Sequence, residues 1–105
     1  MRMIELKKFD KADFEARAVD AAKLMRVLSN EQRLLILCHL GVGELSVGEI
    51  QQFLALSQSA LSQHLAVLRT ENIVSTRRES QIVFYRISDP STIKIISTLA
   101  EIFCP

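Results

Sequence analysis

The sequence predicts a mainly α-helical chain with one small β-hairpin, arranged as a winged helix-turn-helix: four helices, two strands and a fifth helix. Two observations carry this prediction. Two helix starts follow each other closely within residues 46–71, and two segments rich in β-branched and aromatic residues come next, within residues 73–87. A length of 105 residues suits one domain, so residues 1–105 are expected to form a single winged-helix unit.

The composition allows a packed core and argues against several classes of protein. Hydrophobic residues make up 49% of the chain, and 3 Gly and 2 Pro are too few for a loop-rich or disordered chain. The net charge of +1 neither indicates nor excludes a nucleic-acid partner. No signal peptide is evident, and the apolar run at residues 34–38 is too short to span a bilayer, so we expect a cytoplasmic protein without a membrane partner.

The first two helices are predicted from their spacing and their caps. Residues 1–10 are expected to be a flexible lead-in, and apolar residues then recur with helical spacing from about residue 11 to 28. Ser29 and Gln32 stand at capping-box spacing and predict the start of a second helix over roughly residues 31–40. Because this second helix is apolar nearly all round, it is expected to be central to the core.

The helix-turn-helix is predicted over residues 46–71. Ser46 and Glu49 form a capping box that begins a short helix ending near residue 54. Ser57 can cap the next helix, on which three leucines share one buried stripe: Leu61, Leu65 and Leu68.

The face opposite these leucines carries short, neutral, hydrogen-bonding side chains: Gln58, Ser59, Ser62 and Gln63. A glutamine amide can bond an adenine edge in two places, and serine hydroxyls reach bases or phosphates without crowding. We expect these four residues to contact DNA; the alternative is a polar, solvated face. His64 lies beside the leucine stripe, where packing is at least as good an explanation as a phosphate contact.

The two β-rich segments, residues 73–77 and 82–87, predict a wing over residues 73–87. Arg77 and Arg78 are expected at its turn, where guanidinium groups reach phosphates or the minor groove. The alternative is edge-strand charge that prevents aggregation. Arg33 remains open between a phosphate contact and a local pair with Glu31.

The last helix is predicted over residues 90–104, with Asp89 as its cap and Pro90 in its first turn. One face of this helix is lined by five apolar residues: Ile93, Ile96, Leu99, Ala100 and Phe103. Ile95 and Ile102 add a second apolar edge. This exceeds what a monomer of this size needs, so we expect a homodimer formed through the first and last helices.

These residues carry a family resemblance that covers nearly the whole chain. The pattern Ser57-x-Ser59-x-Leu61-Ser62-x-His64-Leu65-x-x-Leu68-Arg69, with the arginines of the wing, resembles the ArsR/SmtB family of winged-helix repressors. Residues 30–38, residues 45–49 and the Cys-Pro end most resemble its HlyU/BigR-type dithiol subgroup. The resemblance implies a transcriptional regulator that binds an inverted-repeat operator in double-stranded DNA, as a repressor or as an anti-silencing activator.

The resemblance also implies a role for the cysteines. In that subgroup a cysteine of the second helix pairs with one at the end of the last helix, and these positions match Cys38 and Cys104. Oxidation or reactive sulfur would bridge the two thiols and weaken DNA binding, which makes this pair the expected redox-sensing site. The alternatives are inert, packed cysteines in a regulator without an inducer, or a winged-helix module that binds another protein.

No metal, cofactor or catalytic residue is expected. The family's metal sensors carry a Cys-x-Cys arrangement in the first helix of the helix-turn-helix, or His and Asp pairs on the last helix, and this chain has neither. Cysteine at a helix N-terminus, Cys-x-x-Cys and Ser/His/Asp arrangements are also missing from the sequence, so an enzyme is not expected.

Overall fold

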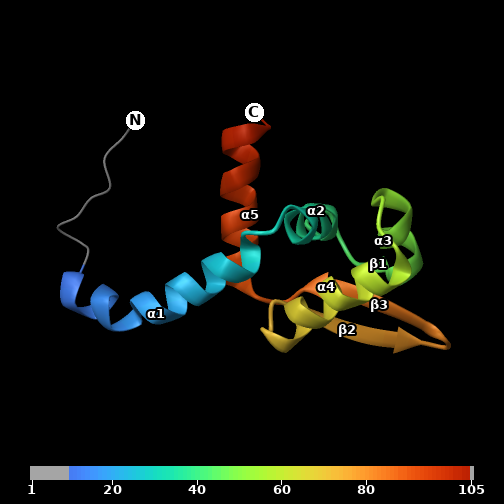
Figure 1. Cartoon of the computed structure of the whole chain (residues 1–105), viewed down its shortest axis with the longest axis horizontal. Helices are drawn as coiled ribbons and strands as arrows, with labels where there is room; N and C mark the ends of the chain where they lie inside the picture. The colour runs from blue at the N-terminus through green and yellow to red at the C-terminus, as the bar shows by residue number, and fades with distance from the viewer. Residues whose placement is uncertain (1–9, 105) are drawn as a thin grey trace.

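The computed structural model describes residues 10–104 (Figure 1). The expected flexible lead-in lies outside the described residues except for Asp10, whose carboxylate accepts from the Asp13 amide and caps the first helix. The elements follow the predicted order, with one additional short strand: α1 (Lys11–Leu28), α2 (Glu31–Leu40), β1 (Leu45–Ser46), α3 (Val47–Phe53), α4 (Gln58–Thr70), β2 (Val74–Glu79), β3 (Ile82–Ile87) and α5 (Pro90–Phe103). The predicted winged helix-turn-helix is therefore confirmed.

The predicted hairpin belongs to a three-stranded antiparallel sheet in the order β1-β3-β2. β1 is only two residues long and pairs Leu45 with Tyr85 and Ser46 with Phe84 on β3. It was not predicted, because two residues carry no periodic pattern and pair with a strand far along the chain. β1 anchors the hairpin to the segment that leads into α3.

The core lies between α2, α4 and the sheet. The three leucines of α4 are at most 2% exposed, as predicted, and they belong to one hydrophobic cluster with Ile36 and Leu37 of α2, Ile50 of α3 and Ile73 before β2. The apolar side of α4 thus packs into the core with α2, α3 and the segment before β2, which leaves its opposite side facing outwards.

The helix caps follow the sequence with one correction. The capping box of Ser46 and Glu49 is present, and Ser57 caps α4 as predicted. The cap of α2 is Asn30 rather than Ser29: the Asn30 side chain accepts from the Arg33 amide, whereas the Ser29 hydroxyl donates to the Arg26 carbonyl at the end of α1. Asn30 caps the helix because it adopts the extended backbone that a cap requires, with φ −140° and ψ 124°.

The two terminal helices project from the rest of the molecule (Figure 1). Every residue from 10 to 20 is exposed, and α5 is buried only at Thr92 and Ile96 near its beginning. Large apolar side chains on both helices are consequently open to solvent: Phe14, Val19, Met25, Ile93, Ile102 and Phe103. Neither these helices nor the others in residues 10–104 are long and apolar enough to cross a membrane.

Candidate nucleic-acid interface and thiol pair

The recognition face is defined here as the side of α4 that carries Gln58, Ser59, Ser62 and Gln63. All four side chains are exposed, whereas Leu61 between them is fully buried. The Ser57 hydroxyl accepts from the Ala60 amide at 3.1 Å and lies 3.3 Å from the Ser59 hydroxyl, so the beginning of the helix is fixed. The recognition face therefore presents hydrogen-bonding groups without charge on a rigid support.

His64 is partly buried at the edge of this face. This position agrees with packing beside the leucine stripe, which was one of its two sequence-based explanations. Arg33 was expected either to contact a phosphate or to pair with Glu31. In the structure its Nε instead donates to the Val27 carbonyl at 2.6 Å, which ties the start of α2 to the end of α1.

The wing places its two arginines differently from the prediction. Both lie within β2, and the turn itself consists of Ser80 and Gln81 between the strands. Successive side chains of a strand point to opposite faces of the sheet. Arg77 is paired in register with Phe84 and Arg78 with Val83, so the two guanidinium groups leave the hairpin in opposite directions.

The guanidinium group of Arg77 is held by two carboxylates. Its Nε and Nη2 donate to one oxygen of Glu44 at 2.8 and 2.7 Å, and its Nη1 donates to Glu79 at 2.7 Å. The same group lies over the ring of Phe84, 4.4 Å from its centroid. The hydrogen bonds to Glu44 and then Glu79 raise the pKa of Arg77 further above its already high ordinary value.

Arg78 is also exposed, but it forms no ion pair among residues 10–104. Its charge remains available to a partner. The structure thus distinguishes two neighbouring arginines that the sequence treats alike.

The two cysteines lie on different helices, 66 positions apart in the sequence. Both are exposed free thiols, Cys38 in the last turn of α2 and Cys104 at the end of α5. Burial raises the pKa of the Cys38 thiol, and the negative charge of the Cys104 thiolate raises it further. The two sulfur atoms therefore lie close enough to interact electrostatically, which sequence periodicity alone could not establish.

The other metal-binding residue types do not gather. Within residues 10–104 no group of three or more His, Cys, Asp or Glu side chains is placed to hold a metal ion. His39, next to Cys38, instead stacks on Phe53 at the end of α3, with ring centroids 4.5 Å apart and planes 9° from parallel. This contact links the helix that carries Cys38 to the helix-turn-helix.

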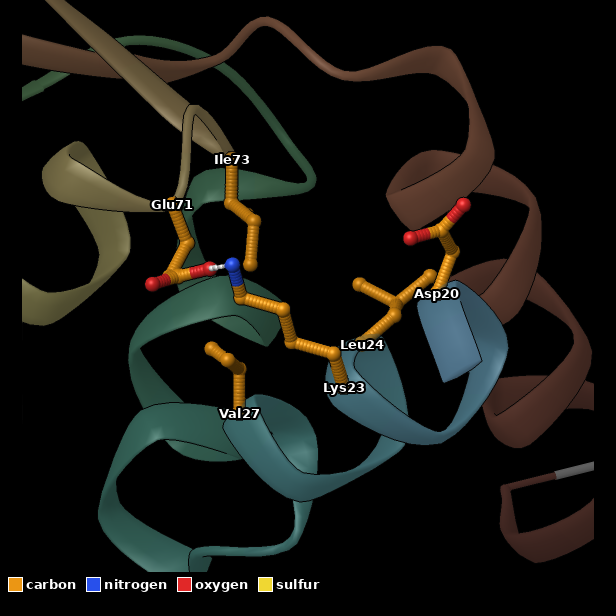
Figure 2. A pocket seen from close by; sticks show the side chains of 6 residues that line it. All are labelled: Asp20, Lys23, Leu24, Val27, Glu71 and Ile73. Atoms are coloured by element: carbon orange, nitrogen blue, oxygen red, sulfur yellow. Dashed lines mark ion pairs between the residues drawn. The ribbon is translucent and has the colours of Figure 1, made fainter. Parts of the chain in front are cut away.

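Figure 2 shows a small cavity between α1 and the segment that joins α4 to β2. Lys23 of α1 extends across it and pairs with Glu71, the C-cap of α4, at 3.5 Å. Leu24, Val27 and Ile73 form its apolar side, and Asp20 lies at its edge. At about 180 Å³ the cavity is smaller than ordinary ligand sites. The ion pair of Lys23 and Glu71 across it connects α1 with the end of α4.

Sequence reasoning missed Glu44 altogether. It stands alone in a loop, and only the folded chain brings it to Arg77, 33 positions away. A signal for part of this arrangement did exist, because strand alternation separates residues 77 and 78 onto opposite faces.

The chain is similar to known bacterial regulators. Residues 30–76 match the model of the bacterial regulatory proteins of the arsR family. The transcriptional activator HlyU of Vibrio cholerae is 47% identical over 92 residues, which cover 88% of this chain and 85% of that protein.

Two solved structures have the same fold. Reduced HlyU from Vibrio cholerae N16961 has a TM-score of 0.84 at 46% identity, covering 89% of this chain and 98% of that one. The transcriptional repressor BigR from Xylella fastidiosa has a TM-score of 0.86 at 40% identity, covering 92% and 99%. These relatives are transcription regulators and not enzymes. Together with the winged helix-turn-helix, they show that this chain belongs to the ArsR family of DNA-binding transcription regulators, with HlyU and BigR as close relatives.

Proposed function

We propose that the chain is a homodimeric regulator that binds an inverted-repeat operator through the recognition face and loses affinity when Cys38 and Cys104 are oxidised. The observation that carries the DNA-binding part is the recognition face itself. It is exposed, rigid and uncharged, and the unpaired charge of Arg78 lies on the adjacent wing. Short polar side chains suit the edges of bases in the major groove, while arginine suits the phosphates beside it. We propose a cytoplasmic location for this regulator, as expected from the sequence.

The recognition face is proposed to work as four residues with distinct tasks. Gln58 and Gln63 offer bidentate amides for adenine, and Ser59 and Ser62 offer hydroxyls for bases or phosphates. Arg77 was also expected to contact DNA, and it lies on the same wing. Its guanidinium is already paired, so Arg78 is proposed as the principal phosphate contact.

The proposed dimer is supported by the apolar surface of α1 and α5. Met25 is 60% exposed, Ile102 61% and Phe103 76%, an amount of open apolar surface that a second copy would cover. A two-fold axis through these helices gives two recognition helices. Half-sites in duplex DNA are about 34 Å apart, so the dimer must hold its recognition helices near that spacing.

The proposed switch is a two-electron oxidation. One thiolate attacks a sulfane sulfur of a polysulfide and becomes a persulfide, while the adjacent S–S bond breaks and the polysulfide leaves shortened by one sulfur. The second thiolate then attacks the cysteine sulfur of this persulfide and expels hydrosulfide. Two thiols have then become a disulfide, one sulfane sulfur has been reduced to hydrosulfide, and the two thiol protons leave on the hydrosulfide and on the shortened polysulfide. Because the pKa of Cys38 is raised, we assign the first attack to Cys104.

The consequence for DNA follows from where the cysteines lie. Cys38 belongs to α2 in the core, and Cys104 ends α5, whose distal half contains no buried residue. A bridge between them would move α5 against α2. Because α5 is part of the proposed dimer interface, such a movement changes the spacing of the two recognition helices, and duplex DNA does not tolerate the change.

Selection of duplexes from a randomised library, followed by fluorescence anisotropy, tests this proposal. The reduced protein is expected to enrich an inverted repeat and bind it saturably, and polysulfide treatment is expected to weaken binding at least about tenfold, a change of 1.4 kcal/mol. Cys104→Ser is the control, and it should bind equally before and after treatment. Equal affinity of both wild-type forms would show that the cysteines are inert, and failure to enrich any duplex would refute the DNA-binding role.

A reporter assay tests the effect on transcription. One relative is named an activator and another a repressor. In either case, reporter output from a promoter with the enriched repeat should change when polysulfide is added to cells with the wild-type chain. It should not change with Cys104→Ser.

A further inference from the structure

We propose that Arg77 and Glu44 form a clamp that positions the wing for DNA, so that Arg77 acts through Glu44 rather than on a phosphate. This inference rests on the proposed DNA-binding function. It assigns a role to Glu44, which lies outside the recognition helix and the hairpin.

The first support is the path of the Arg77 side chain across the sheet. Arg77 starts on β2, an outer strand, and its guanidinium lies 4.4 Å from the ring centroid of Phe84 on the central strand β3. It ends on Glu44, directly before β1, the other outer strand. One side chain therefore ties the outer strand of the hairpin to the body of the protein, across all three strands.

The second support is that the hairpin tip lacks other fixation. Residues 77–82 are all exposed, so no core packing holds this part of the hairpin. Glu44, by contrast, is fixed: its side chain is only 27% exposed, and it follows Gly43, whose φ of 148° is accessible to glycine and rarely to other residues. The clamp joins the free end of the hairpin to a defined point on the α2–β1 loop.

The third support is the charge of the group. Arg77 contacts Glu44 and Glu79, so the three side chains together carry one negative charge. Three of the five N–H groups of the guanidinium are already directed at carboxylates. Because the net charge of these three side chains is negative, they do not attract phosphate, whereas Arg78 on the opposite face keeps its full positive charge. The clamp therefore presents Arg78 while Arg77 stays with its carboxylates.

The clamp and a simple charge effect predict opposite signs. If Glu44 only opposed the phosphates or competed for Arg77, then neutralising it would tighten DNA binding. If Glu44 holds the wing, its loss weakens binding, because the wing must then be ordered when DNA binds. Glu79 provides a matched control: it carries the same charge and contacts the same guanidinium, but from within β2, so it does not connect the hairpin to the body.

The experiment compares Glu44→Ala, Glu44→Gln and Glu79→Gln with wild type on the duplex that the wild-type protein enriches. Glu44→Ala is expected to bind roughly three- to tenfold more weakly. Glu44→Gln, which retains an acceptor oxygen for Arg77, should fall between Glu44→Ala and wild type, and Glu79→Gln should bind as wild type or more tightly. Tighter binding by both Glu44 variants would overturn the proposal.

Hydrogen exchange of the free protein separates the clamp from the DNA-binding function. Amide exchange at residues 78–83 should become roughly threefold faster or more in Glu44→Ala, while the amides of α4 stay as slow as in wild type. Unchanged exchange at the hairpin would overturn the clamp, whatever the DNA measurements show. If exchange accelerates while wild type binds no duplex, the clamp stands and the proposed function fails.

Discussion

Replacing Leu65 by alanine should reduce stability without altering the groups that face DNA. Leu65 is 2% exposed and lies on the buried side of α4, two residues beyond the exposed Gln63. The substitution removes three side-chain carbons at about 0.8 kcal/mol each, and the cavity that remains brings the expected loss to about 3 kcal/mol. Since a domain of this length is stable by roughly 5–15 kcal/mol, the variant should still fold at room temperature.

Urea unfolding and thermal melting at one fixed protein concentration measure this loss, and the melting temperature should fall by roughly 12–20 °C. Gln63→Ala is the matched variant on the opposite side of the same helix. It should unfold like wild type within about 0.5 kcal/mol, because surface substitutions rarely cost more. Its affinity for the enriched duplex should fall by about 1–3 kcal/mol, the value of one bidentate base contact. Equal loss of stability in the two variants would refute the assignment of the two faces of α4.

Three further outcomes are expected. Ser46→Ala removes the capping box of α3 and should cost about 1 kcal/mol in urea unfolding, whereas an unchanged midpoint would show that the cap contributes nothing. Ser80 has a φ of 58° in the hairpin turn, so Ser80→Gly should not lower the melting temperature; a clear decrease would contradict a strained backbone there. The pKa of Cys38 is raised in the folded state, so the folded chain favours the thiol form of this residue. The resulting contribution to the free energy of unfolding is present at neutral pH and is lost as the pH rises through the folded pKa. Cys104→Ser removes one cause of this shift and should speed alkylation of Cys38 at pH 8, and slower alkylation would contradict the electrostatic influence of Cys104 on Cys38.

The elements that the sequence predicts well are those set by neighbouring residues. The caps at Ser46, Ser57 and Asp89 and the leucine stripe of α4 depend on spacings of a few residues, and the structure has all of them. The predicted cap of α2, Ser29, was wrong. Ser29 and Asn30 are both good capping residues, and only the backbone angles of the folded chain decide between them.

The features that the sequence does not predict depend on contacts between distant residues. β1 exists because it pairs with β3: Leu45 faces Tyr85, 40 positions further along the chain, and Ser46 faces Phe84, 38 positions further along. The pair of Glu44 and Arg77 likewise requires the sheet to form first. Periodicity contains no information about such pairs, so sequence reasoning gave both wing arginines the same role.

NMR of the side-chain amide groups can decide whether the recognition face of α4 contacts DNA. On addition of the enriched duplex, the NH₂ resonances of Gln58 and Gln63 should shift, while that of Gln32 on α2 should stay in place. If the resonances of Gln58 and Gln63 remained unchanged at saturating duplex, the recognition face would not be the surface that binds DNA.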